Sequence, residues 1–534
     1  MAWLVSSSFL LVCLASWTAA YKMAIFVPDI ADSQVLFNTR VAETLAKAGH
    51  DVTMIMISAY DEKSSNPVKT AKEVKIHRVD ASFGFKKQEL DEEKGDLIYL
   101  DLPAWDSRNI QNMNTMVTLF TGSCRKLVEN KEFLNWLAAQ KFDLAFSHMF
   151  DACPMGLIHY AKIPSWIWLS SGALMDFMAY YTGVPSIPSY NPPMMMESSD
   201  QMNFLERTKS FIGHALTTFI WTRMFANRET AIFREVLDPK FPHLTEIARS
   251  CPLVMVNSNE LYEFTRPTLA KVINIGGIGM NFDDAKPLNE ELQHIVKSGK
   301  SLVVFSFGSV APVEKMPTSW KSAFMEAFSR FPKTNFIVSY KGTDLEGKTP
   351  PNVHLFKWIP QADLLKNPKT VAFITHGGYN GLQEGIIAGV PMMTIALFGD
   401  QYRNSKLAER HRFAVNVHKG DVSANTIAEA LRRLIEDKSY SLNVKRLSQM
   451  VRKKPVSAAH LLVSWAEFAA EFQTLDNLVP AGTKLNFIQY YSIDVLAFLL
   501  LVLAVVFFVV FKLLMFIVVK IYALLLAPKK QKQS

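Results

Sequence analysis

The segment VAFITHGGYNGLQEGIIA, residues 371–388, decides the fold of this 534-residue chain. Residues 371–375 are apolar or β-branched and predict a buried strand, and residues 382–388 have the apolar spacing of a helix. The turn between them is rich in glycine, which lets backbone amides come close to an anion, and the beginning of a helix favours negative charge. We therefore predict one unit of a parallel sheet with an anion site at its turn, formed in part by Gly378 and Gly381.

Three polar side chains of this segment share one edge of the predicted helix. His376, Asn380 and Glu384 follow one another at intervals of four, and on a helix such residues drift by only about 40° per step. Imidazole and amide groups suit a phosphate, and a carboxylate suits sugar hydroxyls. Taken alone, the His-Gly-Gly turn is also typical of a structural turn, so the neighbouring strands decide its interpretation.

Two further pairs of side chains follow neighbouring predicted strands. Trp358 and Gln361 come at the end of the strand at 354–358, and Asp400 and Gln401 follow the strand at 391–397. Open parallel sheets bind ligands at the carboxyl ends of their strands, and an indole there can stack on a flat base. Together these residues indicate a site for a nucleotide sugar.

The chain as a whole is predicted to form two doubly wound α/β domains. Its 49% hydrophobic and 20% charged residues exclude a disordered chain. A polar stretch after residue 279 is the predicted linker, and the cleft between the two sheets is the expected ligand site. The predicted strands are 23–27, 52–57, 144–146 and 163–169 before the linker, with a helix at 35–48, and 302–307, 335–340, 354–358, 371–375 and 391–397 after it.

One region of the N-terminal half differs in composition. Residues 185–209 are rich in Pro, Met and Ser, and an aromatic-rich stretch follows at 211–225. We interpret the region as a mobile or substrate-facing excursion; a buried apolar helix is the alternative.

The two ends of the chain carry signals for a membrane. Residues 1–20 have no charged side chain and end in small residues, as a cleaved secretory signal does. Residues 495–511 are an unbroken apolar run that continues past Lys512, long enough to cross a hydrocarbon core of about 30 Å. The region 491–519 is thus the predicted transmembrane helix.

Five lysines and no acidic residue lie between Lys512 and the C-terminus. By the positive-inside rule they put the tail, residues 520–534, in the cytosol and the bulk of the chain in the lumen. Without them the formal charge of +8 falls to +3, too little to indicate a nucleic-acid partner. Lys530 and Lys532 resemble the dilysine retrieval signal of endoplasmic-reticulum membrane proteins, although a basic stop-transfer flank has the same pattern.

The ordered motifs resemble those of a known family. WIPQ at 358–361, HGGxNGxxE at 376–384 and FGDQ at 398–401, after Pro391, are similar to the signature of the UDP-glycosyltransferases. The predicted lumenal topology narrows the resemblance to the animal microsomal UDP-glucuronosyltransferases, and the chain looks closest to nematode members. The resemblance covers nearly the whole chain.

This resemblance implies a GT-B fold, in which two Rossmann-like domains face a cleft. The acceptor-binding domain would be residues 21–285, the UDP-sugar domain 286–450 and a returning helical segment 451–490. The implied activity is inverting transfer of a glucuronosyl or glucosyl unit from a UDP-sugar to small lipophilic acceptors, a conjugation or detoxification reaction in the endoplasmic reticulum. No cofactor is implied besides the co-substrate UDP-glucuronate or UDP-glucose, and homo- or hetero-oligomers stay open.

The resemblance also assigns roles to individual residues. The uracil would be held by Trp358 and Gln361, the phosphates by Ser309 and His376, the diphosphate also by Asn380, the ribose by Glu384, and the transferred sugar by Asp400 and Gln401. Arg266 matches an arginine that reaches the diphosphate from the N-terminal domain; a surface arginine is the alternative.

The catalytic positions depart from the family pattern. The family uses a histidine as base, where this chain has Gln34, and an aspartate to orient it, where this chain has His148. We hypothesise an exchanged pair, with His148 as the imidazole near the acceptor, Gln34 hydrogen-bonded to it or to the acceptor, and Asp151 holding the imidazole. The alternatives are that His148 is only a polar residue at a strand end, that the acceptor needs no base, or that the chain binds UDP-sugar without catalysis, as a partner subunit would.

Cysteine and glycine patterns limit other classes of function. Cys124, Cys153 and Cys251 remain after the predicted signal, and an odd number permits at most one disulfide, whose pairing the sequence leaves open. No Cys/His spacing predicts a metal site. An NAD(P) oxidoreductase is disfavoured because no Gly-x-Gly-x-x-Gly follows the strands at 23–27 or 302–307.

Overall fold

The computed structural model describes residues 20–61, 70–103, 105–280, 285–308 and 311–526. The chain divides into two compact units, Met1–Val479 and Pro480–Ser534. Most of the predicted signal peptide, Ser309, and the lysines at 529–532 lie outside the described residues.

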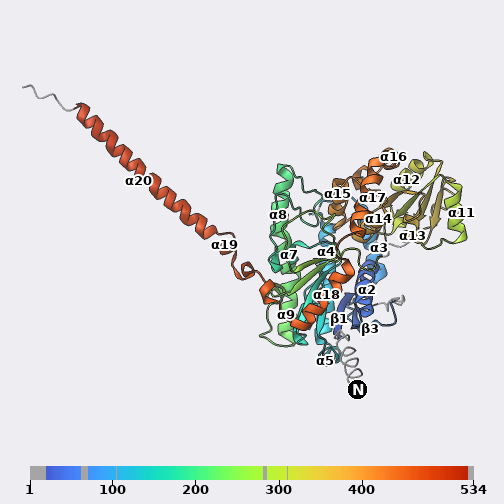
Figure 1. Ribbon diagram of the computed structural model, residues 1–534, viewed down its shortest axis with the longest axis horizontal. Coiled ribbons are helices and arrows are strands. Elements are labelled where there is room, and N and C mark those ends of the chain that lie inside the picture. The colour runs from blue at the N-terminus through green and yellow to red at the C-terminus, as the bar shows by residue number, and fades with distance from the viewer. Residues whose placement is uncertain (1–19, 62–69, 104, 281–284, 309–310, 527–534) are drawn as a thin grey trace, which may run out of the picture. The chain divides into compact units, whose positions relative to one another are not determined.

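The first unit contains two fully parallel sheets (Figure 1). The first has the order β3-β2-β1-β4-β5-β6-β7 and the second the order β10-β9-β8-β11-β12-β13. In both sheets the second and third strands lie on one side of the strand that comes first in the chain, and the fourth strand lies on its other side, as in doubly wound sheets. The prediction of two such domains is therefore confirmed. The strands are β1 Lys22–Pro28, β2 Asp51–Ser58, β3 Lys75–Asp80, β4 Leu144–His148, β5 Ser165–Ser170, β6 Leu253–Val256, β7 Val272–Asn274, β8 Ser301–Ser306, β9 Thr334–Ser339, β10 Val353–Phe356, β11 Thr370–Thr375, β12 Met392–Thr394 and β13 Ala414–Asn416.

Helices connect and cover these strands. In chain order they are α2 Asp32–Lys47, α3 Lys87–Leu97, α4 Ser107–Glu129, α5 Lys131–Ala139, α6 Cys153–Tyr160, α7 Asp176–Thr182, α8 Phe204–Trp221, the π-helix η1 Thr222–Ala226, α9 Asn227–Val236, α10 Leu244–Arg249, α11 Glu290–Ser298, α12 Thr318–Ser329, α13 Gln361–Leu365, α14 Tyr379–Ala388, α15 Gln401–Arg410, α16 Ala424–Glu436, α17 Lys438–Arg452 and α18 Ala458–Phe472. Short 3-10 turns are η2 Val313–Lys315, η3 Lys419–Asp421, η4 Asp476–Leu478 and η5 Ala481–Lys484.

Each sheet is buried on both faces, which explains its continuous apolar strands. In β1, Met23, Ile25 and Val27 pack with α2 and α18 on one face, and Ala24 and Phe26 pack with α4, α5 and α6 on the other. This alternation follows from the two-residue period of a strand. The second sheet is likewise enclosed, by α12 and α16 on one face and by α11, α14 and α17 on the other.

Helix α18 lies late in the chain but packs on the first sheet. Its Leu462 and Ala466 are fully buried in the cluster that contains α2. The chain therefore returns from the second sheet to the first, and this contact helps to fix the two domains of the first unit to each other.

The aromatic-rich region forms α8 and η1. Ser210, His214 and Trp221 of α8 are buried, whereas Phe211 and Phe219 are 68% and 62% exposed. The alternative of a wholly buried apolar helix is thus wrong, and its contact with a substrate stays a prediction.

The second unit contains α19, Phe487–Tyr490, and α20, Ile493–Leu526. Helix α20 has 34 residues and a mean hydropathy of 3.2 over its most apolar window. At about 1.5 Å per residue it is longer than the hydrocarbon core of a bilayer. The apolar run predicted from the sequence does form one helix of membrane-spanning length.

Candidate active site

The turn from β11 to α14 has the geometry of an anion site. Gly377 has a φ of +81°, and a Cβ there would lie 2.7 Å from Ser405 Oγ, so only glycine fits. Helix α14 begins after Gly378, and no side chain caps its first turn. The first amides of a helix have no partner within the helix, so these amides are available to a ligand.

His376 stands beside this turn and lacks a partner of its own. Burial lowers the pKa of its imidazole to about 4, which keeps it neutral near pH 7. Its Nδ1 atom is buried and has no hydrogen-bond partner among the described residues. An unsatisfied buried nitrogen beside uncapped amides fits a phosphate oxygen as the missing partner.

Gln361 and Glu384 are brought together as the sequence predicts. Gln361 Nε2 donates to Glu384 Oε2 at 2.7 Å. Arg40 Nη2, from α2, lies 3.9 Å from Glu384 Oε1, and burial raises the pKa of this carboxyl. Trp358, just before α13, is 76% exposed, so its indole is free to stack on a planar group.

Asn380 joins the two domains. Asn257 Nδ2, from the end of β6, donates to Asn380 Oδ1 at 3.2 Å, and Asn380 Nδ2 donates to the Ser33 carbonyl at 3.4 Å. Gln383, which sequence reasoning missed, extends this contact: its amide donates to the Asn257 carbonyl at 2.6 Å and accepts from Gly277 N at 3.0 Å. Helix α14 is therefore both the wall of the site and the element on which the domains meet.

Asp400 and Gln401 lie at the beginning of α15, after the connection from β12. Asn404 Nδ2 donates to Asp400 Oδ2 at 2.8 Å, and burial raises the pKa of this carboxyl. A Cβ built on Gly172, after β5, would lie 3.8 Å from the same oxygen. Asp400 thus faces the first sheet across the cleft.

Gln401 has a structural role in this loop. Its Oε1 accepts from the amides of Leu397 and Phe398 at 2.9 and 3.1 Å. The predicted strand 391–397 is thus too long: β12 ends at Thr394, and the amide of Leu397 bonds to a side chain instead of a strand.

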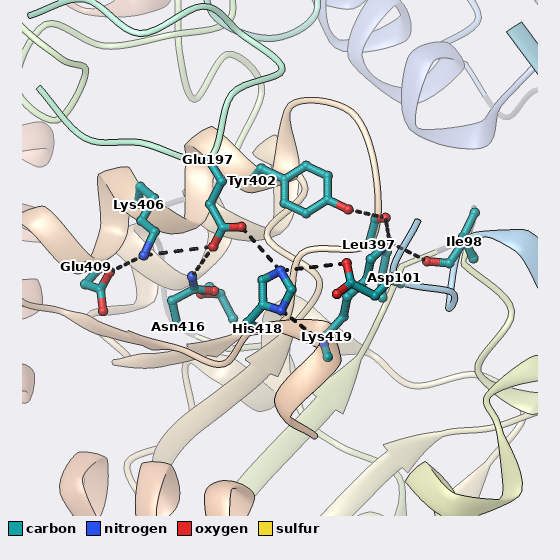
Figure 2. A network of polar contacts seen from close by, with 12 residues as sticks. Ile98, Asp101, Glu197, Leu397, Tyr402, Lys406, Glu409, Asn416, His418 and Lys419 are labelled. Atoms are coloured by element: carbon teal, nitrogen blue, oxygen red, sulfur yellow. Dashed lines mark hydrogen bonds and ion pairs between the residues drawn. The ribbon is translucent and has the colours of Figure 1, made fainter. Parts of the chain in front are cut away.

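A polar network connects the same loop to the first domain (Figure 2). Lys419 Nζ donates to the Leu397 carbonyl at 3.2 Å and to the Ile98 carbonyl at 3.4 Å. His418 Nε2 lies 3.9 Å from Asp101 Oδ1 and 3.7 Å from Glu197 Oε2. Two carboxylates of the first domain thus meet cationic and imidazole groups of the second.

Glu197 makes two further contacts in Figure 2. Asn416 Nδ2 donates to its Oε1 at 3.1 Å, and Lys406 Nζ lies 3.9 Å from that oxygen. Asp400 and Gln401 therefore lie in a loop that both domains hold.

His148 and Asp151 lie together on the opposite side of the cleft. His148 ends β4 and is 4% exposed; its Nδ1 accepts from Phe150 N at 3.3 Å, and its Nε2 lies 3.9 Å from Asp151 Oδ1. Burial lowers the pKa of His148 to about 3 and raises that of Asp151 to about 7. Gln34 lies in the first turn of α2, and within the described part of the chain no hydrogen bond joins it to His148.

A second buried carboxyl, Glu229 of α9, was missed by sequence reasoning. Glu229 Oε2 accepts from Ala152 N at 2.9 Å, and Asp151 Oδ1 accepts from Cys153 N at 3.1 Å. Burial and the charge of Asp151 raise the pKa of Glu229 well above its ordinary value. Both carboxyls thus occupy the beginning of α6.

The disulfide left open by the sequence joins Cys124 of α4 to Cys153 of α6, and Cys251 is free and buried. A narrow cavity of about 10 Å³ lies beside it, lined by His148 and Asp151 among others. That is about the space of one water molecule. The disulfide therefore fixes the backbone next to both polar groups.

Within the described residues, Arg266 makes no hydrogen bond to the β11–α14 turn. Its Nη2 donates to the Pro185 carbonyl at 2.9 Å, and its charged neighbours are Asp176, Arg403 and Glu263. The guanidinium is buried, so the surface-arginine alternative is also wrong.

Two further features of the molecule bear on the choice of site. Within the residues that the structure describes, no group of three or more His, Cys, Asp and Glu side chains is arranged to hold a metal ion. An open depression of about 760 Å³, lined by Arg446 and Lys453 among others, contains none of the predicted site residues.

Comparisons with known proteins agree with this geometry. The model of the family described as "UDP-glucoronosyl and UDP-glucosyl transferase" matches residues 24–526. Mouse UDP-glucuronosyltransferase 1A7 is 33% identical over 481 residues, 88% of this chain and 87% of the relative. Putative UDP-glucuronosyltransferase ugt-47 of Caenorhabditis elegans is 30% identical over 488 residues, 89% of each chain.

Solved structures of glycosyltransferases share the fold. Phytolacca americana UGT2, complexed with UDP-2fluoro-glucose and pterostilbene, superposes with a TM-score of 0.54 at 15% identity, over 84% of this chain and 100% of the other. The glycotransferase of kitacinnamycin gives 0.56 at 16% identity, over 85% and 99%. These neighbours confirm the predicted GT-B architecture.

Proposed function

The chain belongs to the UDP-glucuronosyl and UDP-glucosyl transferase family, a family of hexosyltransferases, and on this premise we propose that it transfers a glucuronosyl or glucosyl unit from a UDP-sugar to small lipophilic acceptors with inversion. The observation that carries the proposal is the Gln361–Glu384 pair, which lies between an exposed Trp358 and an uncapped α14.

The donor would bind along the edge of the second sheet. Uracil stacks on Trp358, the ribose hydroxyls bind Glu384, and the diphosphate takes the free amides of α14 and the imidazole of His376. The sugar then faces Asp400, across from Gly172. A diphosphate is the leaving group, and these donors stabilise the negative charge that it gains.

The acceptor would bind on the first sheet, next to His148. Since burial keeps the pKa of His148 low, the imidazole is neutral and can accept a proton. The acceptor oxygen bonds to the anomeric carbon while its proton passes to Nδ1 of His148, which then gives up the hydrogen bond that it accepts from Phe150 N. The bond from that carbon to the diphosphate oxygen breaks, and its electron pair leaves on UDP. Attack from the face opposite UDP inverts the carbon, and ionised Asp151 stabilises the imidazolium.

A non-catalytic binder of UDP-sugar is the second candidate. Gln34 occupies the position of the family's base and cannot accept a proton from an alcohol. Such a protein would keep the donor residues and lack turnover.

Membrane attachment completes the proposal. Helix α20 would cross the bilayer of the endoplasmic reticulum once, with the lysines after residue 511 in the cytosol and both domains in the lumen. Lipophilic acceptors partition into bilayers, so an anchored enzyme works where they are concentrated.

Product formation tests the proposal. Membranes from cells that express the full chain are incubated with radiolabelled UDP-glucose or UDP-glucuronate and a panel of phenols and amines. We expect a conjugate with at least one donor, absent from membranes that express Asp400→Ala. No product with either donor, in membranes that still bind UDP, would favour the non-catalytic candidate.

A further inference from the structure

The donor site has few positive charges; besides Arg40, Lys366 is the cation that acts on Glu384. A diphosphate carries at least two negative charges at neutral pH, and Glu384 adds a third nearby. His376 is neutral because burial lowers its pKa, and a helix N-terminus supplies only about half a charge. Arg266, the cation expected from the sequence, is hydrogen-bonded to the Pro185 carbonyl instead.

Arg40 is the cation that the first domain brings to this site. Its Nη2 lies 3.9 Å from Glu384 Oε1, which is too long for a hydrogen bond. Within the residues that the structure describes, Arg40 has this one ion pair, and its guanidinium donates no hydrogen bond. Its side chain is only 18% exposed. A mostly covered guanidinium that donates to no described protein group has its donors available for a ligand.

The backbone is shaped to let this side chain pass. Gly279 has a φ of +65°, and a Cβ there would lie 2.7 Å from both Cβ and Cγ of Arg40. Any larger residue at 279 would displace the stem of Arg40. The contact between Asn380 and the Ser33 carbonyl also sets the beginning of α2 beside the beginning of α14, so Arg40 is directed toward the nucleotide side of α14.

The two carboxylate oxygens of Glu384 face different partners. Gln361 already donates to Oε2, and Oε1 faces Arg40 without a hydrogen bond. Ribose hydroxyls are donors that can take Oε1, and they would leave Arg40 free. An arginine side chain matches phosphate oxygens with two parallel donors.

We propose that Arg40 binds the diphosphate of the UDP-sugar from the first domain, and that it is held near Glu384 until the ribose takes that carboxylate. The inference rests on the proposed function and adds to it a residue that links donor binding to both domains.

Inhibition by UDP and by uridine separates a phosphate contact from a structural role. The full chain is assayed in membranes as wild type, Arg40→Gln and Arg40→Lys. The matched control is Arg330→Gln, which removes another arginine–glutamate pair, Arg330–Glu326 at 2.6 Å on α12. We expect Arg40→Gln to raise the inhibition constant of UDP about tenfold and that of uridine less than twofold. Arg40→Lys should raise the UDP constant about threefold, and the control should change neither.

Two results would overturn the inference. Equal weakening of UDP and uridine by Arg40→Gln would mean that Arg40 only supports Glu384, and unchanged UDP binding would mean that Arg40 does not meet the diphosphate. If the wild type itself fails to bind UDP, the proposed function falls and takes the inference with it; if the wild type binds UDP and Arg40→Gln binds it equally well, the inference alone falls.

Discussion

The turn after β11 and the turn after β4 occupy the same place in their two sheets, and both carry a buried histidine. His376 follows β11, His148 ends β4, and burial lowers the pKa of each, to about 4 and about 3. The helices that follow differ. The first turn of α14 is uncapped, whereas the beginning of α6 already holds Asp151 and Glu229.

This difference supports the proposed assignment of the two substrates to the two turns. Free amides attract an anion, and amides already bonded to carboxyls are not available to one. We therefore propose the anionic donor for β11–α14 and the neutral acceptor for β4–α6. The two turns have the same fold, and the side chains at the beginning of the following helix determine whether a turn suits an anionic or a neutral ligand.

The strongest way to break the comparison is to give α14 a carboxylate. Asn380→Asp adds one negative charge to its first turn with almost no change of shape. A charge about 6 Å from a phosphate costs about 3 kcal/mol per unit charge at an effective dielectric constant of 20, so UDP binding should weaken about 100-fold. Asn380→Ala is the control, because it also loses the contact with Ser33 but adds no charge. Equal weakening in both variants, measured by UDP inhibition, would contradict the electrostatic account.

The acceptor turn can be tested by pH. Burial raises the pKa of Asp151 to about 7, so the carboxyl is neutral below that pH and ionised above it. If ionised Asp151 stabilises the imidazolium of His148, kcat should rise about tenfold between pH 6 and pH 8. Asp151→Asn should have a low kcat without this rise. A wild-type profile that is flat, or that falls over the same range, would contradict the role of Asp151.

A smaller effect is expected from the network that connects the loop of Asp400 to the first domain (Figure 2). Glu197 and Glu409 both contact Lys406, at 3.9 and 3.1 Å, but only Glu197 also reaches His418 and Asn416. Partly exposed ion pairs contribute about 0.2–1 kcal/mol. Glu197→Gln should therefore raise KM for the UDP-sugar about threefold, and Glu409→Gln should leave it unchanged. The same KM in both variants would mean that the network does not position the donor loop.

The donor turn could be predicted from sequence because its parts are contiguous. A strand, glycines and polar residues spaced by four in one segment are enough to place His376 and Glu384 on a common edge. The placement of Gln361 and Glu384 at one sheet edge also followed, because parallel strands end at the same edge, but the hydrogen bond between them was not predicted.

Contacts between distant segments could not be predicted in this way. Arg40 meets Glu384 because α2 and α14 face each other across the cleft, and Glu229 reaches α6 from α9. No local pattern marks either residue. Asn380 was predicted to assist at the diphosphate, yet both ends of its amide bond to the first domain. The predicted strand at 391–397 was too long: β12 ends at Thr394, and the amide of Leu397 bonds to the side chain of Gln401.

The account depends most on His148, and one measurement tests it directly. Turnover and UDP inhibition are measured on the same membranes for the wild type and His148→Ala. If His148 is the base of the acceptor turn, kcat should fall at least about 100-fold while the inhibition constant of UDP stays within twofold. A kcat within a few-fold of the wild type would contradict the account, because the second buried histidine would then be structural.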